Sequence, residues 1–495
     1  MIHATPSSNS GSRRRATRLM PAEVCLLLVP AIWTSFHVPA RNPVGIPHLE
    51  RLIVAGAVLG FATCLAAWLL LHLTDHRRAV INGVFVASLL AVAAGGLLRQ
   101  RGPWAGWAIV AVIVLIVTIL TIRMEGSVIP SVLVVTLAVF LLAGPATDAV
   151  SAFSTFGTDT THDSTVEPVD IETDGDVYLV VLDGFPGPET LAADFGAEMS
   201  GLVPMLESRG FEVPGRARAA YPATNYSIPS LLAMGYPSTE EELTNATLQS
   251  LYDVISGDNP VVRSFSESGY ATTMIEAGWS GSSCRHWFDQ CVASPWLDDP
   301  MYHLLRDSLL TDLLTPVTGS NYPVNSLATM QSLSTLSATQ GDEKAFVFAH
   351  VLAPHPPLML ESDCSVVVDE QRAGYFFPRA GVSDDARSEF LLEQTECVVH
   401  FMSEVVDNVD PDDVVIFVAD HGTDRRGQLA KEPSTWTEEE LVERLNVLVA
   451  VRTPMDCPID DDVHLPNVMR QVLSCMGSTS IPDIDEQTYL FTKDL

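Results

Sequence analysis

The chain has 495 residues and a formal net charge of −33 at pH 7, because 61 Asp and Glu outnumber 28 Lys and Arg. The length leaves room for more than one domain. The acids gather after residue 147, where 57 of them stand against 17 basic residues, and a surface so acidic excludes attraction to nucleic acid by charge. No nucleic-acid partner is therefore expected.

Five apolar runs occupy the first part of the chain, and each is close to the ~20 residues with which a helix crosses the hydrocarbon core. The first run holds Glu23 and Pro30 and could instead be a signal peptide, although no small-residue cleavage site is obvious. We predict a basic tail over 1–20 and an all-α bundle of about five transmembrane helices within 21–147. The runs span residues 22–38, 52–73, 79–98, 104–122 and 128–145.

Arginines in the short loops predict the orientation of these helices, because cytoplasmic loops carry an excess of basic residues. Seven of them fall on the side of the N-terminus and four on the opposite side: Arg13, Arg14, Arg15, Arg18, Arg77, Arg78 and Arg123 against Arg41, Arg51, Arg99 and Arg101. We therefore expect a multi-pass protein of the cell membrane with a cytoplasmic N-terminus. An odd number of crossings then places the part after residue 147 outside the cytoplasm.

Residues 148–175 are rich in Ser, Thr and Asp and predict a linker, so the extracytoplasmic domain is expected over 176–495. In that domain short apolar runs alternate with helix-like stretches such as 193–209 and 385–408. This alternation predicts an α/β domain with a central, mostly parallel sheet flanked by helices, whose ligands bind at the carboxyl ends of the strands. The expected strands span residues 176–184, 270–278, 344–352, 413–422 and 444–452.

Six cysteines lie in this part of the chain, whereas Cys25 and Cys64 lie in apolar runs. An even count outside the cytoplasm favours disulfides. A zinc site is the alternative, although no Cys-x-x-Cys pair occurs. Sequence alone allows many pairings, and proximity along the chain suggests Cys284–Cys291, Cys364–Cys397 and Cys457–Cys475.

Two of the predicted strands end on carboxylates: Asp183 follows VYLVVL, and Asp420 follows VVIFVA with His421 next in the chain. Each acid could be a simple helix cap. A carboxylate at the end of a buried strand is costly, however, unless it is paired or bound to metal. Two acids and an imidazole within reach of one another suit one divalent cation; zinc or manganese is favoured, with calcium and magnesium as alternatives.

The stretch YPATNYSIPSLL places two hydroxyl groups, on Thr224 and Ser227, just before an apolar run. A helix is expected to start there with Pro229 in its first turn. Either hydroxyl could be a plain N-cap. The functional interpretation is a nucleophile at a helix N-terminus, where a metal and the local N–H groups lower the pKa of the hydroxyl.

His355 lies between Pro354 and Pro356 in HVLAPHPP, just after a predicted strand. The prolines restrict the backbone and hold the ring outside regular structure. His355 is therefore either a contact for an anionic substrate or a surface histidine in a rigid turn. His350 lies inside the strand and is expected to be a core histidine whose hydrogen bonds are satisfied.

Taken in order, VVLDG, ATNYSIPSLL, HVLAPHPP and VADHG resemble the alkaline phosphatase/sulfatase superfamily over roughly residues 176–455. Five membrane helices before such a domain look like the lipoteichoic-acid synthases and the phosphoethanolamine transferases. The resemblance implies that Thr224 is the nucleophile and that His355 contacts the transferred group. It also implies one metal ion bound by Asp183, Thr224, Asp420 and His421.

The chain departs from the patterns of this superfamily in two places. Type I sulfatases need Cys or Ser-x-Pro-x-Arg, and the segment that starts at Ser227 lacks the Arg, which puts formylglycine chemistry in doubt. Several relatives place a further His after the DHG, where this chain offers other side chains and has no His before His464. The expected substrate contacts there are Arg425, Arg426 and Lys431. Ligands for a second metal are not obvious, so one metal ion is expected.

These observations predict a membrane-bound, metal-dependent hydrolase or transferase that moves a phospho-head group through a phospho-threonine intermediate at the outer membrane face. Ser227 is the fallback nucleophile. Five helices are more than a tether needs, so the expected partners are a membrane lipid or lipid-linked substrate and an acceptor alcohol or water. The alternatives are an extracellular hydrolase of phosphate or sulfate esters and a catalytically inactive relative used for binding or scaffolding.

Overall fold

The structure is a computed structural model that describes part of the chain. The described residues are 19–41, 48–93, 98, 103–125, 127–136, 138–139, 166–196, 199, 201–238, 244–306, 308–309, 322–339, 341, 343–367, 372, 383–455, 457–477 and 479–490. The chain divides into two compact units. The helical unit comprises residues 1–41, 48–153 and 303–314, and the globular unit comprises residues 42–47, 154–302 and 315–495.

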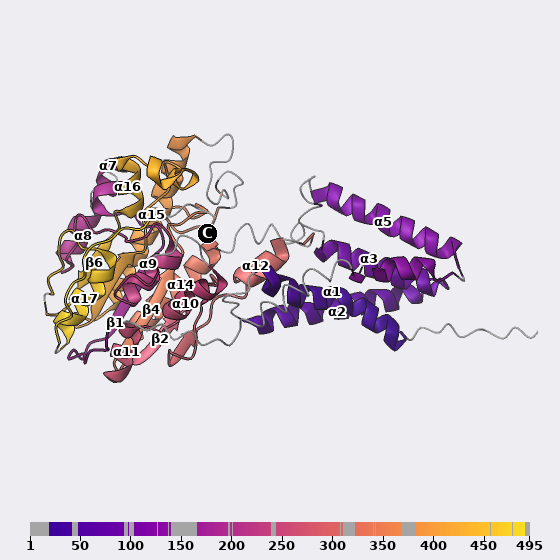
Figure 1. The fold of residues 1–495 in the computed structure, drawn as a ribbon, viewed down its shortest axis with the longest axis horizontal. Helices are drawn as coiled ribbons and strands as arrows, with labels where there is room; N and C mark the ends of the chain where they lie inside the picture. Colours follow the sequence, from indigo (N-terminus) through magenta and orange to yellow (C-terminus); the bar gives the residue numbers. More distant parts are fainter. Residues whose placement is uncertain are drawn as a thin grey trace, which may run out of the picture. The chain divides into compact units, whose positions relative to one another are not determined.

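The helical unit contains α1 (Pro21–Arg41), α2 (Leu49–Leu71), α3 (Arg77–Ala93) and α5 (Pro103–Arg123). Helix α1 packs along α2, α3 packs along α5, and these two pairs meet through α3 (Figure 1). Their common core is apolar and includes Leu27, Ala67, Phe85 and Leu89. An ion pair between Glu23 and Arg77 joins the starts of α1 and α3, with Nε donating to Oε1 at 2.6 Å.

Five crossings are predicted, and among the described residues two helices are long and apolar enough to cross a membrane: residues Leu49–Leu71 and Trp104–Arg123. Helix α1 is apolar over Pro21–Ser35, which is the part of it whose side chains are described. The described part of helix α3 has 17 residues, which at ~1.5 Å per residue gives about 26 Å, and residues 94–97 after it lie outside the described part of the chain. The fifth run is helical over 129–136, and the rest of it lies largely outside the described residues.

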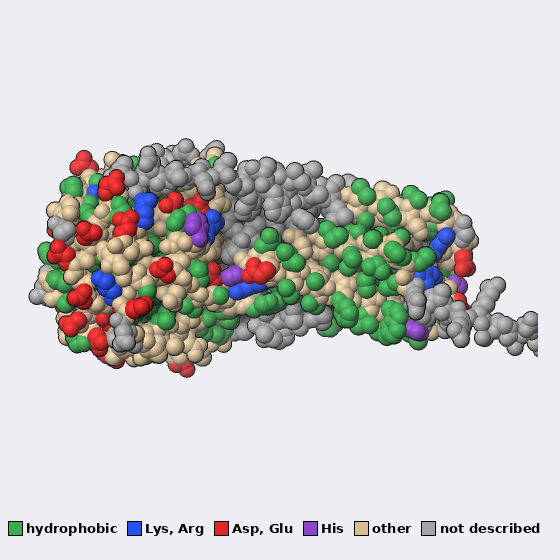
Figure 2. Space-filling model, turned by 90° about the horizontal axis from the view of Figure 1, so that it is seen from below, with side chains coloured by type: hydrophobic (Ala, Val, Ile, Leu, Met, Phe, Trp, Pro, Cys, Tyr) green, Lys and Arg blue, Asp and Glu red, His purple; other side chains and the backbone are tan. Residues whose placement is uncertain are grey.

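Large apolar side chains cover the outside of the two long helices. Phe61 is 70% exposed, Val58 63% and Leu115 58%. Figure 2 shows hydrophobic side chains spread over the surface of the helical unit, while Asp and Glu dominate the charged groups on the globular unit. Water-soluble surfaces rarely carry such continuous apolar patches, so the helical unit has the surface of a membrane-embedded bundle.

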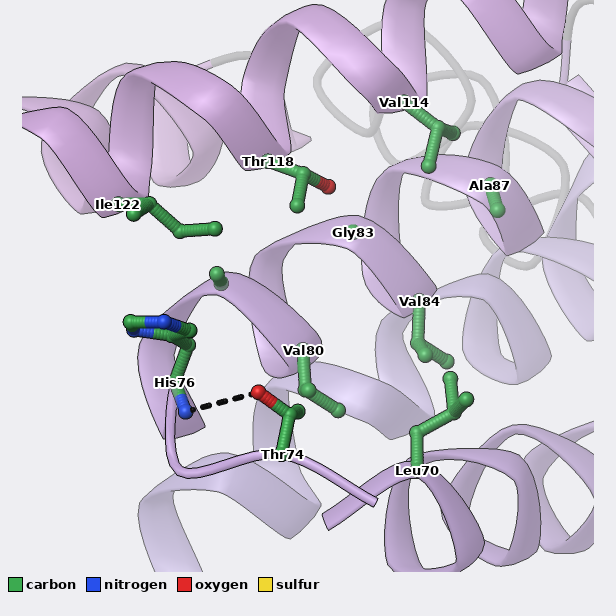
Figure 3. Close-up of a pocket in the computed structure, with 11 residues that line it drawn as sticks. Leu70, Thr74, His76, Val80, Gly83, Val84, Ala87, Val114, Thr118 and Ile122 are labelled. Atoms are coloured by element: carbon green, nitrogen blue, oxygen red, sulfur yellow. Dashed lines mark hydrogen bonds between the residues drawn. The ribbon is translucent and has the colours of Figure 1, made fainter.

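Helices α2, α3 and α5 border a cavity of about 290 Å³ (Figure 3). Its walls are mostly aliphatic, with Thr74, His76 and Thr118 as polar groups. A Cβ atom on Gly83 would lie 3.1 Å from the Thr118 hydroxyl, so glycine permits the close approach of α3 to α5 beside this cavity.

The globular unit is built on a six-stranded sheet with the order β3-β2-β4-β1-β5-β6 (Figure 1). All neighbouring strands are parallel except β5 and β6, which pair antiparallel. The strands are β1 (Val177–Leu182), β2 (Ala271–Ile275), β3 (Gln290–Val292), β4 (Ala345–Val351), β5 (Val414–Ala419) and β6 (Val449–Arg452). Every residue of β1 and β5 is buried, so both faces of the sheet are covered.

This sheet confirms the predicted α/β domain with a mostly parallel sheet. All five expected strands are present, and among the described residues β3, which has three residues, is the one strand that was not predicted. The helix expected over 193–209 is instead two short helices, separated near Gly196, whose φ of +52° ends the first of them. The helices are α7 (Pro188–Asp194), α8 (Leu202–Ser208), α9 (Thr224–Leu232), α10 (Asn245–Ile255), α11 (Pro260–Glu267), α12 (Asp299–Arg306), α14 (Tyr322–Ala338), α15 (Asp384–Asn408), α16 (Glu438–Leu445) and α17 (Leu465–Met476).

Part of the expected linker packs onto the globular unit. Val169 and Ile171 are buried there, and their amides donate to the hydroxyls of Ser264 at 3.0 Å and Ser268 at 2.8 Å. Residues 148–165 lie outside the described part of the chain.

Three disulfides brace the globular unit, and they are the pairs suggested by proximity: Cys284–Cys291, Cys364–Cys397 and Cys457–Cys475. Cys25 and Cys64 in the helical unit are free thiols. The second disulfide joins the segment after β4 to helix α15.

Candidate metal centre

The three central strands of the sheet deliver polar side chains to one edge. Leu182, the last residue of β1, is in register with Val351 of β4 on one side and with Ala419 of β5 on the other. The next residues along β1 and β5 are Asp183 and Asp420. Because these strands are parallel and adjacent, the two acids emerge side by side at the carboxyl edge, where α/β sheets bind ligands.

His421 brings this edge together with the start of helix α9. Its Nε2 atom lies 3.1 Å from the Thr224 hydroxyl, 3.5 Å from Asp183 Oδ1 and 3.4 Å from Asp420 Oδ2. Four side chains that span residues 183 to 421 therefore surround one point. The two acids and the imidazole are buried, whereas Thr224 is half-buried.

The neighbours of His421 define its tautomer. Nδ1 lies 2.9 Å from the carbonyl oxygen of Gly422, and a carbonyl can only accept, so the proton sits on Nδ1. Burial and the positive charge of Arg444 hold the pKa of His421 well below its usual range. The ring is therefore neutral, and the lone pair of Nε2 points toward Thr224 and the two carboxylates.

This arrangement fits a cation. Asp183 Oδ1 and Asp420 Oδ2 are buried and have no hydrogen-bond partner among the described residues. Two carboxylate oxygens thus face an unprotonated ring nitrogen at about 3.5 Å. Buried acceptors of this kind are costly until a positive centre lies between them. Nitrogen and oxygen donors in such a cluster suit a divalent metal.

The two carboxylates titrate in opposite directions. Burial raises the pKa of Asp183, but His355, His350 and His421 outweigh it and bring the pKa below its usual value. For Asp420, burial and the negative charge of Asp183 raise the pKa to about 7. Without a cation, Asp183 carries the charge and Asp420 tends to keep a proton.

A pH dependence of stability follows for the metal-free protein. Because the pKa of Asp420 rises from 3.8 to about 7 on folding, the folded state holds a proton that the unfolded state releases. The resulting stability is complete below pH ~4 and is lost as the pH rises toward ~7. We expect Asp420→Asn to gain in relative stability across this window and to level off above it. Guanidinium unfolding in chelator measures the difference.

The difference between the two proteins isolates Asp420, since all other titrating groups are common to both. His355 and His421 act in the opposite direction, because their pKa values are lowered in the folded state and they lose stability as the pH falls. A stability difference that does not change between pH 4 and pH 7 would contradict the assignment of the raised pKa to Asp420.

His355 lies at the same site. One of its ring nitrogens belongs, with atoms of Asp183 and His421, to a set of donors that all lie within 4.8 Å of one another. Nδ1 lies 2.7 Å from the carbonyl of Pro356 and donates to it, which leaves Nε2 as an acceptor or ligand. Burial lowers the pKa of His355 although Asp183 opposes it. His355 is half-buried beside Asp183 and His421, which favours the predicted substrate contact, or a metal ligand, over the alternative of a surface histidine.

His350 corrects one expectation. It was expected to be a core histidine with satisfied hydrogen bonds, and it is fully buried, but neither ring nitrogen has a hydrogen-bond partner among the described residues. Nε2 lies 3.5 Å from Asp183 Oδ2, and the ring completes a second donor set with Asp183 and Asp420. Sequence reasoning missed His350 because a histidine inside a strand carries no pattern of its own.

Helix α9 begins earlier than expected. Its first residue is Thr224, so Pro229 lies inside the helix rather than in its first turn. Ser227 is fully buried, and its hydroxyl donates to the carbonyl of Tyr221 at 2.8 Å. The structure therefore gives Thr224 an accessible position beside His421 and engages Ser227 elsewhere.

The three cations expected to contact substrate are engaged in ion pairs. Arg425 and Arg426 both bind Asp194, at 2.7 and 2.8 Å, and Arg426 also binds Glu443. Lys431 pairs with Glu440 of α16. These contacts fix the loop after Asp420-His421 to α7 and α16, and they lend no support to a role in substrate binding.

No family model and no curated protein matches the chain. Solved structures resemble it only distantly. They include the integral membrane protein lipooligosaccharide phosphoethanolamine transferase A from Neisseria meningitidis, with 12% identity over 92% of this chain and 95% of that one and a TM-score of 0.40. A 2-O GAG sulfatase shares 14% identity over 64% and 73%, with a TM-score of 0.43. A protein in the alkaline phosphatase superfamily from Vibrio parahaemolyticus shares 14% identity over 65% and 72%, with a TM-score of 0.39.

These structures are of the kinds that the ordered motifs resemble: a membrane phosphoethanolamine transferase, a sulfatase and an alkaline phosphatase superfamily protein. Because each TM-score is below 0.5, the likeness adds no weight to the functional inference. That inference rests on the donor cluster and on the hydroxyl beside it.

Proposed function

We propose that the protein is a membrane-bound, metal-dependent enzyme of the alkaline phosphatase superfamily that moves a phospho-head group at the outer face of the membrane. One observation carries this proposal: two carboxylate oxygens without a hydrogen-bond partner among the described residues lie beside an unprotonated imidazole nitrogen, which the half-buried hydroxyl of Thr224 contacts at 3.1 Å. Such a cluster is costly without a bound cation, which favours a metal-dependent enzyme over an inactive scaffold.

The proposed metal site consists of Asp183, Thr224, Asp420 and His421, with His350 and His355 as further donors nearby. A divalent cation held there would lower the pKa of the Thr224 hydroxyl and neutralise negative charge during transfer. The mixed nitrogen and oxygen donors favour zinc or manganese, with calcium and magnesium as alternatives.

The reaction is proposed to proceed in two displacements at phosphorus. The Thr224 oxygen attacks the phosphorus in line and loses its proton; the bond to the leaving alcohol breaks, and that alcohol takes up a proton. His355 would contact an oxygen of the transferred group when its Nε2 carries a proton, and this N–H would stabilise the negative charge of that group. An acceptor alcohol or water then attacks the phospho-threonine, which restores the Thr224 hydroxyl.

The membrane location is proposed from the helical unit and the cysteines. The two long helices expose their apolar side chains, and the three disulfides of the globular unit suit an oxidising compartment. The bias of loop arginines to one side supports a cytoplasmic N-terminus. We propose that the remaining apolar runs also cross, for about five crossings and an extracytoplasmic globular unit. A lipid or lipid-linked donor fits an enzyme built in this way.

A covalent adduct tests this function. The full-length protein in detergent, loaded with zinc or manganese, is incubated with a phospholipid donor without acceptor, and the peptide that contains Thr224 is analysed by mass spectrometry. We expect the mass of the transferred head group on Thr224. An adduct on Ser227, or none while soluble nitrophenyl esters are turned over, would contradict the proposed transfer from lipid.

A further inference from the structure

Arg444 connects the two halves of the candidate site. It lies near the end of α16 and is only 5% exposed. Its Nε donates to the carbonyl of Pro222 at 2.7 Å, and its Nη2 donates to the same oxygen. Its Nη1 donates to the carbonyl of Gly422 at 2.8 Å. One guanidinium thus holds two backbone positions that are 200 residues apart in the chain.

Both carbonyls belong to segments that carry the chemistry. Pro222 precedes Thr224 by two residues, and Gly422 directly follows His421. The carbonyl oxygen of Gly422 also accepts a hydrogen bond from His421 Nδ1–H. The group that sets the tautomer of His421 is therefore itself held by Arg444. In return, the amide of Gly422 donates to the carbonyl of Arg444 at 2.7 Å.

Arg444 forms no salt bridge with the described residues. No carboxylate of the described residues lies within ion-pair distance of its guanidinium, in contrast to Arg425 and Arg426. Burial lowers the pKa of Arg444, while the more distant charges of Asp424, Asp420 and Asp183 raise it. Burying a cation without a contacting acid is costly, so the geometry that it provides is its evident use.

Arginine is suited to this geometry, and lysine is not. The planar guanidinium presents donors in a fixed fork, and here one side of the fork holds Pro222 while the other holds Gly422. An ammonium group is a single centre on a flexible stem and cannot hold two carbonyls at a fixed separation. Helix α16 has anchors besides this one, since a capping box between Thr437 and Glu440 closes its first turn.

We propose that Arg444 is a positioning residue that fixes the Thr224 hydroxyl against the His421 imidazole, so that nucleophile and metal ligand share one site. This inference rests on the proposed function and adds to it a residue that no motif marks. Arg444 acts through two backbone carbonyls and touches neither metal nor substrate. Loss of the hydrogen bonds from its guanidinium should therefore weaken metal binding. It should also lower kcat more than it raises KM.

The chain contains a matched control in Arg470. This arginine is 6% exposed on α17, and it too holds backbone carbonyls, with Nε on Met234 at 2.7 Å and Nη1 on Pro482 at 2.6 Å. Neither carbonyl adjoins a proposed ligand. Arg444→Lys and Arg470→Lys therefore make the same chemical change in equally buried positions, inside and outside the site.

The test uses the full-length protein in detergent. Zinc affinity is measured by competition with a chelating dye, kcat and KM with 4-nitrophenyl phosphate, and unfolding by thermal denaturation. We expect Arg444→Lys to weaken zinc binding by roughly 10- to 100-fold, as changes behind a metal ligand do, and to lower kcat with a smaller change in KM. Arg470→Lys should lower the unfolding temperature about as much as Arg444→Lys does, and it should leave zinc affinity unchanged within about threefold.

The proposal would be overturned if Arg444→Lys kept the zinc affinity of the wild type. It would also be overturned if Arg470→Lys lost as much zinc affinity as Arg444→Lys. If Arg444→Lys unfolds too readily for kinetics, zinc affinity at low temperature still decides between these outcomes. The failure of the proposed function is distinguishable: the wild-type protein would then bind zinc and respond to Arg444→Lys without any turnover that depends on Thr224.

Discussion

Thr224→Ala is expected to abolish turnover while the protein stays folded. A nucleophile that forms the covalent intermediate has no substitute, and its removal typically costs at least about a thousand-fold in kcat. Thr224 is half-buried, and its hydroxyl contacts His421 at 3.1 Å without bracing other elements. The free energy of unfolding should therefore change by no more than about 1 kcal/mol. The measurement is turnover of a phospholipid donor and of 4-nitrophenyl phosphate, beside thermal unfolding.

Two variants control this experiment. Thr224→Ser keeps a hydroxyl at the start of α9 and should retain part of the activity. Ser227→Ala removes the buried hydrogen bond to the carbonyl of Tyr221, so it should lose about 1–3 kcal/mol of stability and keep its turnover. If Thr224→Ala works at the wild-type rate and Ser227→Ala does not, the nucleophile is Ser227 and the assignment made here is wrong.

Asp183→Asn and Asp420→Asn are expected to remove tightly bound metal. Each change replaces a charged ligand with a neutral amide, and Asp183 and Asp420 are the two carboxylates of the proposed ligand set. The purified wild-type protein should hold about one equivalent of zinc or manganese, and either variant should hold almost none, as measured by elemental analysis after dialysis against a weak chelator. Turnover should fall in parallel.

The free energy of unfolding of Asp420→Asn relative to the wild type should depend on whether metal is present. Without metal, Asp420→Asn should be more stable than the wild type near neutral pH, because it relieves the buried charge beside Asp183. With metal at about 100 times its Kd, the wild type should gain about 2.7 kcal/mol and the variant should not. Asp461→Asn is the control, since this acid is exposed and pairs with Arg216 outside the site. Equal metal content in the site variants and this control would rule out the proposed ligand set.

The strands and the carboxylates at their ends could be predicted because their signal is local. Six apolar residues before Asp183 and six before Asp420 mark buried parallel strands, and adjacency in the sheet then brings the acids together. The short strand β3 and the antiparallel direction of β6 carry no such signal. Two of the five predicted crossings are present as long apolar helices, and the other three stay a proposal because their apolar runs lie partly outside the described residues.

The rest of the site depends on partners that are distant in the chain. His350 looks like any core histidine until the structure leaves its ring without hydrogen bonds beside Asp183. Arg444 resembles an ordinary helix-terminal arginine until it binds the carbonyls of Pro222 and Gly422. Arg425 looked like a substrate contact because the acid that pairs with it, Asp194, lies more than 200 residues earlier.

Anomalous diffraction from crystals of the full-length protein grown with zinc tests the central claim most directly. The account predicts one strong peak about 2.0–2.2 Å from His421 Nε2 and from carboxylate oxygens of Asp183 and Asp420, with the Thr224 oxygen beside it. A protein that crystallises in zinc with no peak at this position, or with zinc bound only at surface acids, would contradict it.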